Sequence, residues 1–200
     1  INLLPRFFDV TKGAITLDGI NIRELTQKEL RDQIGYAPQK GLLFSGSVAS
    51  NLMIGKPEAS AEEMLEAIQI AQAEDFVCKD ENGLNMEISQ GGTNVSGGQK
   101  QRLSIARAVI KKPPVFIFDD TFSALDFKTD AALRQAIAQK LSDSTLLVVT
   151  QRVSTAKLSD QILVLDNGRV VGKGKHSDLM RSCETYQEIA NSQLSEEELA

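Results

Sequence analysis

Two kinds of apolar pattern alternate along the chain. Between Ser60 and Val77, apolar residues recur at helical spacing, and Glu63 stands where it completes a capping box with Ser60. The continuous apolar runs Val115–Phe118 and Leu146–Val149 are instead typical of buried parallel strands. Strands that alternate with helices indicate an α/β fold with a mainly parallel sheet.

Turn and capping signals place the remaining elements. Asp18-Gly19 is a tight-turn signal that ends a strand, and Thr26 with Glu29 begins a short helix. Gly, Asn and Ser are frequent in residues 79–97, which predicts a loop that leads into a helix. The pattern predicts strands at 14–17, 34–37, 115–118, 146–149 and 161–165, and helices at 60–77, 99–110, 128–141, near Ser154 and from Ser177.

The predicted strands lie in two separate parts of the sequence. Residues 47–110 contain no comparable strand, so we interpret them as a helical subdomain inserted into the α/β core. The predicted organisation is a first core portion at 1–46, the helical subdomain at 47–110, a second core portion at 111–190 and an acidic tail at 191–200.

Composition limits the classes of partner. The 200 residues carry a net charge of −5 with scattered Lys and Arg, which argues against nucleic acid and anionic lipid as partners. The apolar runs are too short to cross a bilayer, so a membrane role requires another segment or subunit. Cys78 and Cys183 are isolated, which favours free thiols over metal ligands. The chain opens on an apolar run at Ile1 without a capping residue, so we expect that preceding residues are missing.

Two carboxylates follow the apolar run at 115–118. In open α/β sheets, ligands bind at the edge where strands end, and Asp119 and Asp120 are predicted to lie there. A carboxylate in this place can hold Mg²⁺ on a nucleotide phosphate, and a neighbouring acid can orient the attacking water. Taken alone, the pair is equally compatible with solvated acids at a plain strand end.

A second candidate site precedes the helix predicted at 99–110. Ser96-Gly97-Gly98-Gln99 combines a hydroxyl with paired glycines that let the backbone approach an anion closely. The following helix would direct unpaired N–H groups at that anion. These residues therefore predict a phosphate cradle, with an ordinary glycine-rich helix entry as the alternative.

Several motifs occur together in one order and spacing. The run 95–102 (VSGGQKQR), the run 116–120 (FIFDD) and the run 123–126 (SALD) together resemble the signature, Walker B and D-loop of ABC-transporter ATPases. Ala37-Pro38-Gln39 resembles the Q-loop, and residues 43–52 resemble the segment that exporters place beneath their coupling helices. The late segments 166–169 and 174–176 also match, so the resemblance covers most of residues 1–190.

The resemblance implies a P-loop nucleotidase-like domain that powers export with ATP and Mg²⁺ at the cytoplasmic face of the cell membrane. Its implied partners are a transmembrane domain of the same polypeptide and a second ABC subunit bound head to tail. The implied roles are metal contact for Asp119 and Gln39, cradling of the partner's γ-phosphate for Ser96, Gly97, Gly98 and Gln99, coupling of the two sites for Asp126, and hydrolysis for Asp120 with Gln151.

The chain departs from the family pattern at three points. No GxxxxGK followed by Ser or Thr occurs, so the N-terminal part of the fold, with the phosphate loop, is expected to be missing before Ile1. Asp120 stands where efficient members have Glu, and Gln151 stands at the usual switch histidine. A shorter acid orients water poorly. The two losses resemble the degenerate subunit of a heterodimeric exporter.

Other functions remain open at this point. The chain could belong to a soluble ABC ATPase of repair or translation, or to a regulatory domain that no longer hydrolyses or binds nucleotide. The only histidine, His176, is expected to be structural. Because a phosphate loop follows a buried strand, we also expect these residues alone to lack a central strand and to fold marginally.

Overall fold

The computed structural model describes residues 1–194, which divide into two compact units. The first unit is Ile1–Val149 and the second begins at Thr150. The acidic run at 196–198 lies outside the described residues. The first unit contains β1 (Thr16–Leu17), β2 (Ile20–Asn21), α1 (Gln27–Asp32), β3 (Ile34–Ala37), β4 (Gly46–Ser47), α2 (Val48–Met53), α3 (Ala61–Ile70), α4 (Glu74–Val77), η1 (Gly83–Asn85), β5 (Glu87–Ile88), η2 (Gln90–Gly92), α5 (Gly97–Val109), β6 (Val115–Asp119), α6 (Phe127–Lys140) and β7 (Thr145–Val149).

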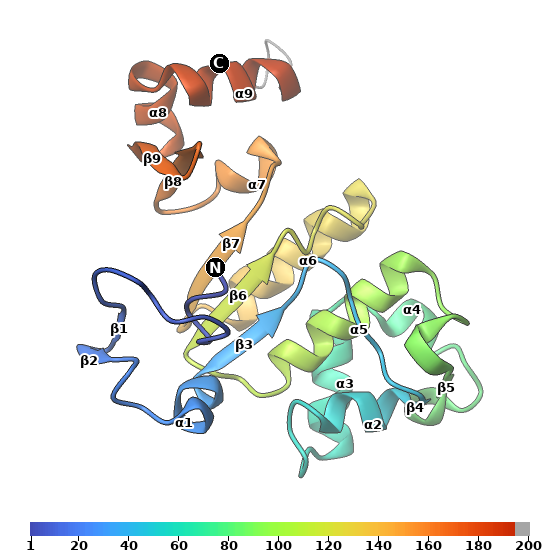
Figure 1. The fold of residues 1–200 in the computed structure, drawn as a ribbon. Helices are drawn as coiled ribbons and strands as arrows, with labels where there is room; N and C mark the ends of the chain where they lie inside the picture. The colour runs from blue at the N-terminus through green and yellow to red at the C-terminus, as the bar shows by residue number, and fades with distance from the viewer. Residues whose placement is uncertain (195–200) are drawn as a thin grey trace. The chain divides into compact units, whose positions relative to one another are not determined.

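The first unit is built on a parallel sheet of β3, β6 and β7, in that order (Figure 1). Ile34 pairs with Val115, and Val115 pairs in turn with Thr145, so the three strands run in register. Two short antiparallel ladders, β1 with β2 and β4 with β5, lie outside this sheet. The α/β class and the parallel sheet predicted from the sequence are confirmed.

Strand β6 is buried on both faces. Phe116 and Phe118 pack into the core that α3, α5 and α6 supply. Ile117, which points to the other face, packs with Ile34 and Leu30. The alternation follows from the two-residue period of a strand and explains why this segment is apolar at every position.

Strand β7 differs from the prediction. We expected a buried strand, but Leu146, Leu147 and Val149 are 37%, 36% and 41% exposed. Within the described residues β7 pairs only with β6, so it is an edge strand. Its apolar side chains therefore lack the cover that those of β6 have.

The helix predicted over 60–77 is two helices, α3 and α4. Ser60 and Glu63 form the expected capping box. After Ile70 the chain enters the left-handed region at Gln72 (φ 56°), and the amide of Ala73 donates to the carbonyl of Ile68. This hydrogen bond is that of a Schellman motif, which ends α3 before α4 begins.

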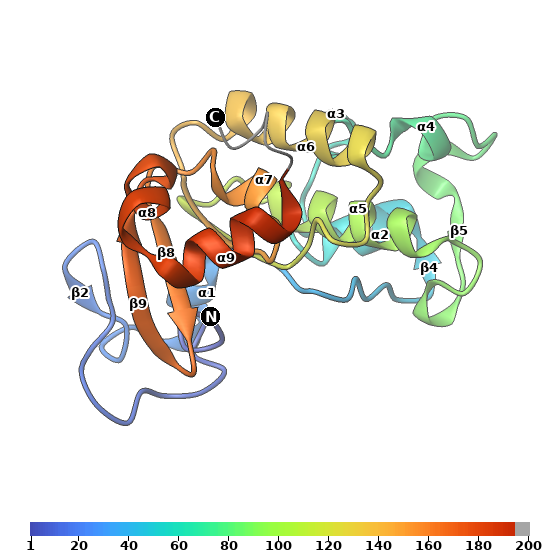
Figure 2. The same cartoon turned by 90° about the horizontal axis from the view of Figure 1, so that it is seen from above.

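The second unit is a β-hairpin covered by helices. Strands β8 (Ile162–Asp166) and β9 (Arg169–Gly174) pair antiparallel, and Asn167 and Gly168 form the turn with positive φ angles of 46° and 76°. Figure 2 shows α9 crossing this hairpin, where it contacts β8. The predicted C-terminal helix is divided at Cys183 into two. The helices of the second unit are α7 (Val153–Ala156), α8 (His176–Ser182) and α9 (Glu184–Gln193).

The lengths of the helices determine whether any of them could cross a membrane. Among residues 1–194, none of the helices combines the length and the apolar character needed to cross a bilayer.

Candidate functional site

Four polar side chains meet where β3 and β6 end; we call Tyr36, Gln39, Asp119 and Asp120 the sheet edge. The hydroxyl of Tyr36 donates to Oδ2 of Asp119 at 3.1 Å. Nε2 of Gln39 donates to Oδ2 of Asp120 at 3.2 Å. The structure thus brings together Gln39, Asp119 and Asp120, which the sequence placed on two different strands.

The backbone at Asp120 is held tightly. Asp120 lies in the left-handed region (φ 45°), which aspartate adopts more readily than most residues. Its amide donates to the carbonyl of Val149 at 2.9 Å. One residue later, the buried hydroxyl of Thr121 donates to the carbonyl of Ala37 at 3.0 Å, which ties the ends of β6 and β3 together.

The sheet edge is acidic, and this affects Tyr36. Burial raises the pKa of the Tyr36 phenol, and the negative charge of Asp119 and the hydrogen bond to it raise this pKa further. Tyr36 is therefore a neutral hydrogen-bond donor at physiological pH. It orients one oxygen of the Asp119 carboxylate without neutralising its charge.

The signature loop, Ser96–Gln99, begins the 13-residue helix α5. Ser96 is the N-cap: its hydroxyl accepts from the amide of Gln99 at 3.2 Å, and Oε1 of Gln99 accepts from the amide of Ser96 at 2.8 Å. Within residues 1–194, the amides of Gly97 and Gly98 donate no hydrogen bond. The loop therefore presents two free amides at a helix N-terminus, the arrangement that binds anions.

The space around the signature loop is open on one side. A Cβ on Gly97 would meet no atom within 4 Å, whereas a Cβ on Gly98 would lie 3.5 Å from the carbonyl oxygen of Ala124. The segment 123–126, predicted as the D-loop, therefore lies beside the signature loop. Gly97 faces free space in this chain, where a ligand held by another molecule could approach.

Asp126 caps the helix that follows the D-loop segment. Its carboxylate accepts from the amide of Thr129 at 3.0 Å and from the Thr129 hydroxyl at 2.7 Å. Both hydrogen bonds lower the pKa of the Asp126 carboxyl, and the one from the Thr129 amide has the larger effect. Asp126 is exposed, so its charged carboxylate both caps α6 and faces solvent.

Gln151 belongs to the second unit. Its side chain is exposed, and its carbonyl accepts from Nε2 of Gln193 at 2.7 Å. Oε1 of Gln193 accepts from the amide of Val153 at 3.0 Å, so one side chain of α9 fixes the backbone on both sides of Arg152. The predicted cooperation of Gln151 with Asp120 stays a prediction.

The comparisons with known proteins agree with this geometry. Residues 1–123 match the family model described as ABC transporter. The chain belongs to the ABC transporter family. It is 48% identical over 196 residues to an uncharacterized ABC transporter ATP-binding protein of Mycobacterium tuberculosis, which covers 96% of this chain and 33% of that protein.

Two further similarities concern ABC exporters. A candidate multidrug export ATP-binding/permease protein of Staphylococcus aureus is 41% identical over 189 residues, covering 94% of this chain and 33% of that protein. The structure of a bacterial Atm1-family ABC exporter with ATP bound superposes with a TM-score of 0.92 at 37% identity, covering 98% of this chain and 34% of that one. The chain thus has the ABC ATPase fold and spans about a third of the length of these relatives.

The donor set of this ABC domain suits Mg²⁺. Among the described residues, no group of three or more His, Cys, Asp or Glu side chains could hold a metal ion by itself. Mg²⁺ needs no such cage, because it is usually bound by one or two carboxylates together with nucleotide phosphates and water. Asp119 offers the carboxylate, and Gln39, which donates through Nε2 to the adjacent Asp120, offers an amide oxygen. The residues present therefore fit the nucleotide-bound magnesium that the family implies.

Three residues around this ABC site escaped the sequence-based prediction. The sequence predicts Tyr36 only as part of the strand at 34–37 and does not single out Thr121, although each makes a hydrogen bond that organises the sheet edge. Gln101 was noted only as part of the signature run. Gln101 is a polar residue on a helix and is only 2% exposed, and this burial is the feature that marks it as functionally interesting. Burial of this kind is visible only once the neighbours of α5 are known.

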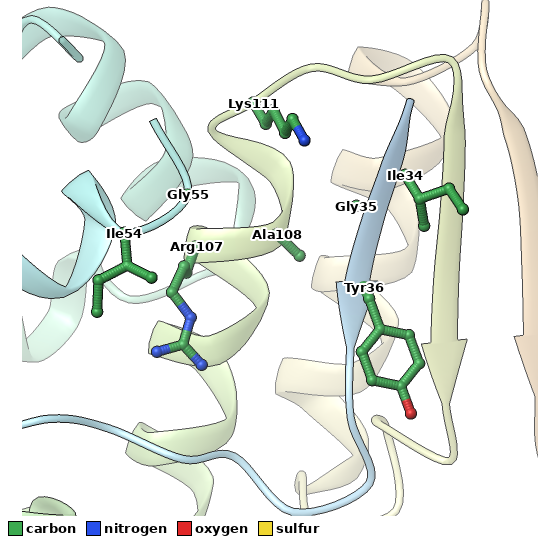
Figure 3. A pocket seen from close by; sticks show the side chains of 8 residues that line it. All are labelled: Ile34, Gly35, Tyr36, Ile54, Gly55, Arg107, Ala108 and Lys111. Atoms are coloured by element: carbon green, nitrogen blue, oxygen red, sulfur yellow. The ribbon is translucent and has the colours of Figure 1, made fainter. Parts of the chain in front are cut away.

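A small hollow lies beside α5 (Figure 3). It measures about 210 Å³ and is lined by residues of β3, α5 and the end of α2. Arg107 borders it; Nη2 of Arg107 donates to the carbonyl of Leu42 at 2.8 Å, and its guanidinium lies 5.8 Å from the centre of the Phe44 ring. Burial lowers the pKa of Arg107. Leu42 and Phe44, to which Arg107 is bound, have exposed side chains, and so do Ile54, which lines the hollow, and its neighbour Met53.

Proposed function

We propose that this chain is part of the ATP-binding and hydrolysing domain of an ABC exporter. One observation carries the proposal: the sheet edge and the signature loop are two incomplete halves of nucleotide sites. The sheet edge offers a carboxylate for magnesium, and the signature loop offers free amides without a carboxylate. Each half needs a complementary half, as in a head-to-tail pair of such domains.

The roles of the site residues follow from this arrangement. Asp119 and Gln39 contact the Mg²⁺ of the chain's own nucleotide, and this ion supplies charge neutralisation of the phosphates. Asp120 orients the attacking water, with Gln151 at the switch position. Asp126 links the two sites. Ser96, Gly97, Gly98 and Gln99 bind the γ-phosphate of the nucleotide on the partner subunit.

We propose that the chain's own site hydrolyses ATP slowly. Asp120 is one methylene shorter than Glu, and a misplacement of about 1 Å can lower a rate on the order of a hundredfold. Gln151 has no titratable group with which to manage a proton. The signature loop carries no comparable defect. The chain therefore serves as the degenerate subunit of a heterodimer and completes the partner's competent site.

The exposed apolar patch around Arg107 (Leu42, Phe44, Met53 and Ile54) supports a membrane-domain partner. Three of these side chains are more than half exposed: Leu42 at 65%, Phe44 at 57% and Ile54 at 55%. Contiguous exposed apolar groups mark interaction sites. Phe44 lies in the segment 43–52 that resembles the docking surface of exporters, and the other three residues directly flank that segment. We propose that the transmembrane domain docks here at the cytoplasmic face of the membrane.

The deciding experiment measures ATPase activity of the full-length protein, alone and co-expressed with the ABC subunit encoded next to it, with Ser96 intact or replaced by Arg. We expect activity only with the neighbour, and loss of that activity on Ser96→Arg, because the bulky cation blocks the free amides. Robust activity of the full-length protein alone would contradict the degenerate-site proposal.

Two alternatives have distinct outcomes in the same experiment. A soluble ABC ATPase would be active without any membrane-domain partner, although the exporter names of two relatives favour transport. A regulatory domain without hydrolysis would leave the complex insensitive to Ser96→Arg. The transported substrate is set by membrane segments outside this chain.

A further inference from the structure

Gln101 joins the helix of the signature loop to the Q-loop. It lies in the second turn of α5 and is 2% exposed. Its Oε1 accepts from the amide of Gly41 at 2.9 Å, and its Nε2 donates to the carbonyl of Pro38 at 2.9 Å. One buried side-chain amide therefore uses both its donor and its acceptor on the two ends of the segment 38–41.

The backbones of the two segments also touch. A Cβ on Gly41 would lie 2.8 Å from the carbonyl oxygen of Lys100, closer than real Cβ contacts come. Any larger residue at position 41 would force the Q-loop away from α5. The contact is thus close and polar, and a displacement of the segment 38–41 must be passed to α5 or break two buried hydrogen bonds.

The two ends of this contact belong to different nucleotide sites. On one side, Gln39 lies between Pro38 and Gly41 and donates to Asp120 at the sheet edge. On the other side, the signature loop is the first turn of the same helix that carries Gln101, and a helix transmits displacement along its axis as a rigid element.

We propose that Gln101 is a positioning residue that couples the chain's own magnesium site to the signature loop, which acts on the partner's nucleotide. This role rests on the function proposed above. When Gln39 shifts with the occupancy of its own site, Gln101 carries the shift into α5. The degenerate site could in this way control the hydrolysis at the competent one.

The neighbouring Arg102 provides a matched control. Its Nη1 donates to the carbonyl of Gln72 and to Oδ1 of Asp75, each at 2.6 Å, and its guanidinium lies 4.8 Å from the Phe76 ring centre. Arg102 thus ties the same helix to the α3–α4 connection and not to the Q-loop. Arg102→Met removes hydrogen bonds from α5 without touching the proposed link.

Hydrogen exchange in the full-length protein with its ABC partner tests the link directly. In Gln101→Leu we expect exchange to become at least about tenfold faster at the Gly41 amide, because that amide loses its acceptor, and also to rise in the segment 96–100. Gln101→Glu keeps an acceptor for Gly41 and should protect this amide. Arg102→Met should leave segment 38–41 unchanged. If the exchange rates in segment 96–100 are unchanged in Gln101→Leu, the proposal is overturned.

The ATPase assay of the same complex separates coupling from stability. Gln101→Leu should lower kcat about tenfold and leave KM for ATP within about twofold, because it changes the position of the signature loop and not the partner's binding loop. An equal loss of kcat in Arg102→Met would mean that Gln101 is merely structural. If Ser96→Arg leaves the ATPase activity of the complex unchanged, the proposed function fails. The hydrogen-exchange result still decides whether Gln101 links segment 38–41 to segment 96–100.

Discussion

At the sheet edge, Asp119 and Asp120 each accept a hydrogen bond from a side chain of the same chain, whereas at the signature loop the amides of Gly97 and Gly98 donate none within residues 1–194. One half-site is organised from within the chain, and the other is left open. In the function that we propose, this difference reflects where each half finds its ligand. Groups that hold a metal must be oriented by neighbours beforehand, while groups that meet a partner's phosphate stay free until the partner arrives.

The largest expected effect comes from blocking the free amides of the signature loop with a side chain. A Cβ on Gly97 meets nothing within 4 Å, so Gly97→Ala should fold normally. In the complex, however, the methyl group would stand between the free amides and the phosphate. We expect kcat of the complex to fall by about 10² to 10³, as when an oxyanion-hole donor is lost. ATPase assays alongside thermal unfolding check this, and full activity with an unchanged melting temperature would break the comparison.

The next largest effect tests the slow hydrolysis that we propose for the sheet edge. Asp120→Glu combined with Gln151→His should raise hydrolysis at the chain's own site on the order of tenfold, because the longer acid reaches the water and the imidazole can exchange a proton. Site-resolved trapping of nucleotide in the complete heterodimer measures it. Asp120→Asn is the control that removes the acid. Equal trapping in the double variant and the wild type would count against a degenerate site.

A smaller effect should follow from the hydroxyl that orients Asp119. Tyr36→Phe removes one hydrogen bond, so we expect the Mg²⁺ concentration for half-maximal nucleotide binding to rise about threefold. The chain has only two tyrosines, and Tyr186→Phe is the matched control. Tyr186 lies in the second unit and is buried, whereas Tyr36 is partly buried, and the Tyr186 hydroxyl lies 2.9 Å from Nδ1 of His176. A rise of the same size in both variants would mean that the Tyr36 hydroxyl does not serve the metal.

Two apolar strands show what the sequence can and cannot predict about the fold. The runs at 115–118 and 146–149 look alike, and both were correctly assigned as parallel strands. Only β6 is buried on both faces; β7 is exposed because it has a single neighbour among the described residues. Periodicity reports the backbone conformation, and burial depends on which other segments are present.

The candidate site shows the same limit. The sequence placed Gln39 and Asp119 at the ends of strands, and the parallel pairing of β3 with β6 brings them together. Ser96 and Gln99 have the spacing of a capping box, as the boxes predicted at Thr26 and Ser60 do, but the sequence-based prediction assigned them only to a phosphate cradle. The sequence could not show Gln101 on the Q-loop. The two hydrogen bonds of Gln101 join residues 60 and 63 positions apart, and such contacts do not follow from a local pattern.

The smallest expected effect concerns the acid beside the open half. The amide and hydroxyl of Thr129 hold the pKa of Asp126 below its ordinary value. For a depressed pKa, the stabilisation is fully present above the unfolded value, about 3.9, and is lost as pH falls through the lower folded pKa. Asp126→Asn keeps the capping oxygen but does not titrate. We therefore expect the wild type to be the more stable of the two at pH 6, and this small advantage to be lost progressively as the pH falls below about 4. Thermal unfolding of the complete domain at both pH values measures it, and a difference independent of pH would show that the Asp126 charge adds nothing to the cap.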